Sequence, residues 1–149
     1  MEAEGGPAGL PAISRRPDSA IIVLRNVHCK KGVWIVKMTA EHRAIDKIFR
    51  RRDRYEIPDW QRGEVWDNAK NQRLIDSILR GWNLPKFYFV AVSDDNFLVE
   101  DGQQRLAAIF DFFSDDLPLS PESAALFGGT LYSSLPRKVA DSFDDFEIE

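Results

Sequence analysis

Residues 97–113 read FLVEDGQQRLAAIFDFF, and this stretch decides most of the expected architecture. The apolar run Phe97–Val99 predicts a strand, and apolar residues at helical spacing between Leu106 and Phe113 predict a helix. Residues 101–105 (DGQQR) join the two through a tight turn. We expect Asp101 to cap the helix and Gly102 to allow both an unusual backbone angle and the close approach of a ligand.

The same turn has the composition of an anion-binding site. The first N–H groups of a helix lack partners within the helix, and anions bind well there. Arg105 adds a planar, permanently charged set of donors, and the amides of Gln103 and Gln104 can orient a polar ligand. The alternative interpretation is an ordinary capped helix with a polar first turn.

Length and composition predict one folded domain. The chain has 149 residues, 44% of them hydrophobic, which is enough for a core. A single cysteine, Cys29, excludes an internal disulfide, and no signal peptide or long apolar span is present, so we expect a cytoplasmic protein that does not enter membranes. The net charge of -4 does not favour a general polyanion binder, although basic residues crowd between Arg43 and Arg62.

The first third of the chain predicts a flexible leader, a hairpin and a basic helix. Residues 1–19 lack an apolar period, whereas residues 20–27 and 33–38 are strand-like runs around a Lys-Lys-Gly turn. Thr39 is expected to cap a helix whose apolar positions include Ile45 and Ile48. Four arginines at its end form either a solvated face or a patch that contacts DNA phosphates: Arg50, Arg51, Arg52 and Arg54.

The remaining elements follow from the same patterns. Residues 55–57 predict a short strand, residues 58–66 a structured binding loop, and residues 87–92 a central strand. Asn68 is expected to cap a helix with a buried stripe of Leu74, Ile75, Ile78, Leu79 and Trp82. A loop follows Phe113, a short helix begins near Pro136, and residues 146–149 alternate as the start of a strand, so we expect the domain to continue beyond them.

Residues 55–62 (YEIPDWQR), Trp66, the helix near residues 74–81 and the DGQQR motif resemble, in this order, the N-terminal domain of GmrSD-type restriction systems and related phage-defence proteins. The resemblance covers about residues 40–149. It implies an α+β fold similar to ParB and sulfiredoxin, a small mixed sheet with flanking helices, here preceded by an extra N-terminal hairpin within a domain of residues 20–149. It also implies binding and hydrolysis of a nucleoside triphosphate in a DNA-targeting system, and a nuclease domain or subunit as a partner.

The resemblance also implies roles for individual residues. Gln61, Arg62, Gly102, Gln103, Gln104 and Arg105 would bind the nucleotide. Asp101, Gln104 and Arg105 would serve catalysis, with Asp101 as the ligand of Mg²⁺. Two alternatives stay open: a non-enzymatic module of the same fold that binds DNA or another protein, and a ParB-like nuclease that acts directly. Since the chain supplies no histidine-based metal motif, we expect nuclease activity to need another domain.

Overall fold

The computed structural model describes residues 21–28, 34–58 and 65–148, and their fold is α+β, which confirms the predicted class. One five-stranded mixed sheet has the order β2-β1-β5-β6-β4, and a second, two-stranded sheet pairs β3 with β7. The strands are β1 (Ile21–His28), β2 (Trp34–Glu41), β3 (Arg43–Ala44), β4 (Tyr55–Glu56), β5 (Phe87–Ala91), β6 (Phe97–Asp101) and β7 (Glu147–Ile148). The similarity to ParB in particular stays a prediction.

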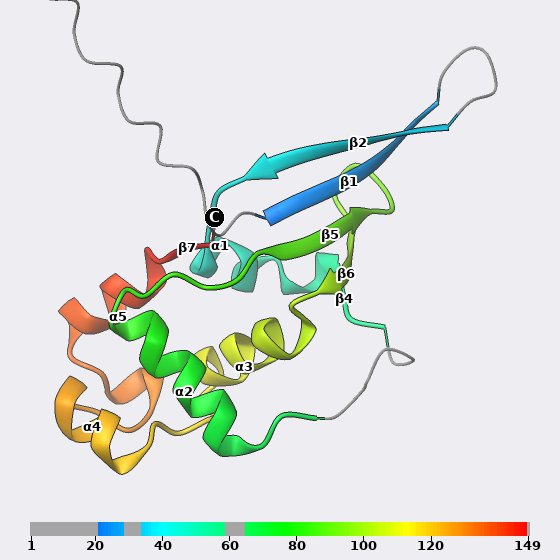
Figure 1. Ribbon diagram of the computed structural model, residues 1–149. Helices are drawn as coiled ribbons and strands as arrows, with labels where there is room; N and C mark the ends of the chain where they lie inside the picture. The colour runs from blue at the N-terminus through cyan, green and yellow to red at the C-terminus, as the bar shows by residue number, and fades with distance from the viewer. Residues whose placement is uncertain (1–20, 29–33, 59–64, 149) are drawn as a thin grey trace, which may run out of the picture.

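The helices lie on one side of the five-stranded sheet (Figure 1). They are α1 (Ile45–Arg50), the 3-10 helix η1 (Arg52–Arg54), α2 (Asn68–Leu79), α3 (Gln103–Phe113), α4 (Pro121–Phe127), the 3-10 helix η3 (Tyr132–Ser134) and α5 (Arg137–Asp144). No helix among these described residues is both long and apolar enough to cross a membrane.

The core forms where the covered face of the sheet meets α2 and α3. Val23, Phe89 and Val99 are register partners on adjacent strands, so their side chains share this face, and all three are fully buried. Ile75 of α2 and Ile109 of α3 are equally buried against them. Burial on this scale is the main stabilising contribution, since a fully buried aliphatic or aromatic side chain contributes roughly 1.5–3 kcal/mol.

The N-terminal hairpin is confirmed, and it belongs to the main sheet. Strand β1 lies between β2 and β5 and pairs in parallel with β5 from Ile21 opposite Phe87 to Leu24 opposite Val90. From Arg25 onward, β1 pairs with β2 alone, and Figure 1 shows this half of the hairpin extending past the end of β5. The hairpin therefore has one half inside the sheet and one half that reaches beyond it.

Several predicted helix boundaries are wrong. Thr39 caps no helix, because β2 stays paired with β1 through Glu41 and α1 begins only at Ile45. Helix α2 is capped by Asp67, whose side chain accepts from the backbone N–H of Lys70 at 2.7 Å, and Asn68 is its first residue. Trp82 is not part of the buried stripe and is 58% exposed, because α2 ends before Gly81 turns the chain with a φ of 72°.

Helix α4 was not expected. Its start has the usual features, since the Ser120 side chain accepts from the backbone N–H of Ser123 at 3.2 Å and Pro121 occupies the first turn. Its end is marked by Gly128 in the left-handed conformation, with a φ of 85°. The short helix near Pro136 and the terminal strand are confirmed as α5 and β7, and β7 pairs with β3.

Candidate functional site

The DGQQR motif lies where β6 passes into α3, as the sequence predicts, but its cap differs from the expectation. Asp101 is the last residue of β6, and Gly102 occupies the N-cap of α3 with a φ of 93° and no side-chain cap. Only glycine fits here comfortably, since a Cβ on Gly102 would lie 2.4 Å from the ring of Phe87. The expected capping role of Asp101 is therefore wrong, and the helix begins with a bare backbone turn.

Arg105 is buried and anchors this turn to the preceding chain. Its guanidinium donates to the backbone carbonyls of Pro85 and Lys86 (3.1 Å for Lys86), and to the Asp101 carboxylate at 3.1 Å. It also lies 4.4 Å from the centre of the Phe87 ring. Burial lowers the pKa of Arg105, and the charge of Asp101 offsets part of this effect. Most of the donors of Arg105 are therefore engaged within the fold.

The side chains of Gln103 and Gln104 differ in burial and in their hydrogen-bond partners. The Gln103 side chain is buried and donates to the Val99 carbonyl at 2.9 Å, which holds the start of α3 against β6. The Gln104 side chain is half-buried and accepts from the backbone N–H of Trp66 at 3.4 Å. Gln61 and Arg62, the other two predicted ligands, lie outside the described residues. Trp66 therefore links the end of the predicted binding loop to the motif.

One residue near this turn, Lys70, was missed by the sequence prediction. The ammonium of Lys70 lies 4.5 Å from the centre of the Trp66 ring, so an exposed cation stands beside the residue that contacts Gln104. The i, i+4 spacing of Trp66 and Lys70 at the start of α2 is the sequence feature that could have indicated this pair.

One carboxylate at the turn is open to solvent. The Asp101 side chain is 65% exposed, although one oxygen contacts Arg105. No group of three or more His, Cys, Asp or Glu residues that could hold a metal occurs in the described part of the chain. Mg²⁺ is commonly held by one or two carboxylates together with substrate phosphates and water, so the single Asp101 fits that mode of binding.

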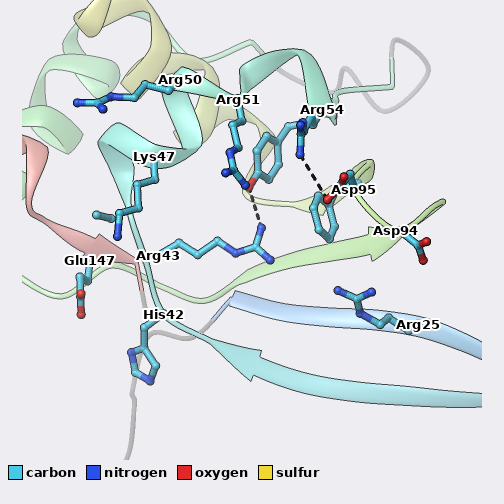
Figure 2. Close-up of a pocket in the computed structure, with 13 residues that line it drawn as sticks. Arg25, His42, Arg43, Lys47, Arg50, Arg51, Arg54, Asp94, Asp95 and Glu147 are labelled. Atoms are coloured by element: carbon cyan, nitrogen blue, oxygen red, sulfur yellow. Dashed lines mark hydrogen bonds and ion pairs between the residues drawn. The ribbon is translucent and has the colours of Figure 1, made fainter.

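A second polar feature is a cavity of about 560 Å³ between the hairpin and the α1–η1 segment. Six cationic side chains and three carboxylates line it, a formal surplus of three positive charges. The cations are Arg25, Arg43, Lys47, Arg50, Arg51 and Arg54, and the carboxylates belong to Asp94, Asp95 and Glu147. Figure 2 shows Arg51 extending toward Arg43 and Arg54 extending toward Asp95 on one side, and Arg25 extending from β1 on the other. This cavity contains three of the four arginines that the sequence indicated as a DNA-contacting patch.

Arg43 forms the fixed base of this basic cavity. Its Nη1 donates to the Tyr55 hydroxyl at 2.8 Å, its Nε donates to Glu41 at 3.1 Å, and its guanidinium lies 4.8 Å from the centre of the Phe97 ring. Burial lowers the pKa of Arg43, but the hydrogen bonds to Glu41 and Tyr55 outweigh it and leave the pKa raised. Arg43 therefore stays charged and holds β3, β4 and β6 together.

These features define a small α+β domain with two polar surfaces, one at a strand-to-helix turn and one in a basic cavity. A family model described as "GmrSD restriction endonuclease, N-terminal domain" matches residues 45–148. The chain belongs to this family, and membership makes it a component of a restriction or phage-defence system. No curated protein and no solved structure matches the chain.

The contact between Gly102 and Phe87 predicts a difference between two glycine substitutions. Gly102→Ala and Gly81→Ala both place a side chain at a positive φ, which costs about 1–2 kcal/mol. Only at Gly102 does the new Cβ also meet the Phe87 ring, and such overpacking costs about 1–3 kcal/mol more. Urea denaturation should show Gly102→Ala as the less stable variant by at least about 1 kcal/mol. Equal losses would show that the ring moves aside freely.

Because the Arg105 side chain bonds to groups within the fold, we expect its removal to lower the stability of the protein even when no ligand is present. Arg105→Ala leaves two carbonyls without their donor and removes the contact with Phe87, so we expect a loss of about 2–4 kcal/mol in the free energy of unfolding. Arg105→Lys should recover part of it, because one ammonium cannot reproduce the forked contact. The control is the exposed Arg73 on α2, whose alanine variant should stay within about 0.5 kcal/mol of the unchanged protein. An Arg105→Ala protein as stable as that control would leave the guanidinium without a structural role.

Proposed function

We propose that this domain binds a nucleoside triphosphate with Mg²⁺ at the β6–α3 turn and hydrolyses it, as the regulatory part of a DNA-targeting restriction system. The observation that carries the proposal is the N-terminus of α3, where Gly102 provides a backbone turn with no side-chain cap. Such an end attracts phosphate through its N–H groups and the helix dipole. The exposed Asp101 carboxylate beside it supports a role for the metal, because a carboxylate alone would repel phosphate.

In this proposal, two residues have roles that differ from those implied by the resemblance. Since Arg105 and Gln103 are held by backbone carbonyls, we assign them to positioning the turn. Contact with the nucleotide falls to the α3 terminus and Gln104, and Lys70 adds a nearby cation. Gln61 and Arg62 keep the roles that the resemblance implies. When bound, Mg²⁺ would neutralise phosphate charge, and Asp101 would hold it and orient the attacking water.

A thermal-shift series with the four common nucleoside triphosphates tests this proposal. A ligand that binds the folded state alone raises its stability, so a triphosphate with Mg²⁺ should raise the Tm and a monophosphate should raise it much less. At a ligand concentration one hundred times the Kd, the gain is about 2.7 kcal/mol. If no triphosphate shifts the Tm, nucleotide binding at this turn is excluded, and the non-enzymatic alternative gains support.

Asp101→Asn should separate the metal from the nucleotide. The neutral amide holds Mg²⁺ weakly, so the part of the thermal shift that depends on Mg²⁺ should fall and hydrolysis should largely disappear, while metal-free nucleotide binding stays similar or improves. Glu122→Gln on α4 is the matched control, since it removes one exposed carboxylate elsewhere. Unchanged Mg²⁺ dependence and unchanged hydrolysis in the Asp101 variant would remove this residue from the mechanism.

A further inference from the structure

We propose that the basic cavity between the hairpin and the α1–η1 segment binds the sugar-phosphate backbone of nucleic acid without reading its sequence. This site is separate from the β6–α3 turn. Phe97, at the start of β6, lines the cavity, whereas Asp101, at its end, belongs to the DGQQR turn. The two residues are four positions apart on an extended strand, which separates them by about 13 Å. The inference does not depend on nucleotide binding.

The charges that a ligand would meet here are those without a partner. Arg50 pairs with Asp46 and Arg54 pairs with Asp95, both at 3.3 Å, and Arg43 is held by Glu41 and Tyr55. Within the described ranges, no ion pair engages the remaining three lining cations: Arg25, Lys47 and Arg51. These three come from β1, α1 and the residue after α1, so they face the cavity from both of its walls (Figure 2).

The hairpin places one more cation, Lys37, beside Arg25. Arg25 on β1 and Lys37 on β2 are register partners, and partners in an antiparallel pair place their side chains on the same face. Arg25 also follows the buried Val23 by two positions, so it lies on the core-facing side of β1, past the last residue that pairs with β5. The face that is apolar inside the sheet therefore carries one pair of cations where the hairpin leaves β5.

This distribution fits an extended polyanion better than a small one. The unpaired cations lie on two walls of the cavity, with Lys37 beside Arg25 on the hairpin wall, whereas one compact anion needs them to converge on a single point. The large aromatic rings that line the cavity belong to Tyr55 and Phe97, which are 8% and 6% exposed, so neither can stack on a base. The lining also includes the exposed imidazole of His42. Contact with phosphates alone gives affinity without sequence preference.

The test is binding of a fluorescein-labelled DNA oligonucleotide, single-stranded and duplex, to the full chain by anisotropy over a range of salt concentrations. Lys47→Ala with Arg51→Ala should weaken binding roughly tenfold or more and lower the slope of log affinity against log salt by about 1.5–2 units. Arg137→Ala with Lys138→Ala is the control. It removes the same charge from exposed positions on α5 and should change the slope little.

Two outcomes overturn the inference. One is an equal loss of DNA affinity in the α5 control, which would assign the effect to net charge. The other is a cavity variant that binds DNA normally but no longer binds inorganic tripolyphosphate, which would assign the cavity to a free polyphosphate. Stability midpoints of both double variants exclude unfolding as the cause. Since neither variant alters the β6–α3 turn, the thermal shift by nucleoside triphosphate should be the same in both, and the two proposals can fail independently.

Discussion

The ring of Phe87 is the contact on which the DGQQR turn depends. It lies against Gly102, where no side chain would fit, and 4.4 Å below the guanidinium of Arg105. Through that guanidinium, the ring connects the carbonyls of the loop before β5 with the first turn of α3. Phe87 is itself fully buried at the start of β5. The position of the α3 terminus is therefore set by the sheet, through contacts within the fold.

The sequence was informative where apolar periodicity is strong and less so at element ends. Strands β5 and β6 and helices α2 and α3 follow from their apolar patterns, and the α+β class follows from their order. The predicted start of α1 was wrong because the strand β2 continues past Thr39. Helix α4 was missed because its seven residues are too few to show a helical apolar period, although Ser120 and Gly128 mark its ends.

The two polar surfaces were predictable to different degrees. The DGQQR turn is contiguous in sequence, so its place between a strand and a helix could be predicted. The burial of Arg105 could not, because its main partners are backbone carbonyls about twenty residues earlier, and carbonyls have no sequence signature. The basic cavity was visible as an arginine cluster, but its opposite wall is Arg25, a single charge within an apolar strand. Only the pairing of β1 with β5 brings the two together.

The position of β1 in the sheet also sets the limits of the folding unit. The family match begins at Ile45, yet β1 lies between β2 and β5 and precedes that boundary. A chain cut at the boundary would leave β5 as an edge strand, with the apolar face around Phe89 uncovered on one side. Exposed edges of this kind pair with other chains and promote aggregation. In this protein, the hairpin is therefore a structural part of the domain, and a study of the matched region alone would begin with an incomplete sheet.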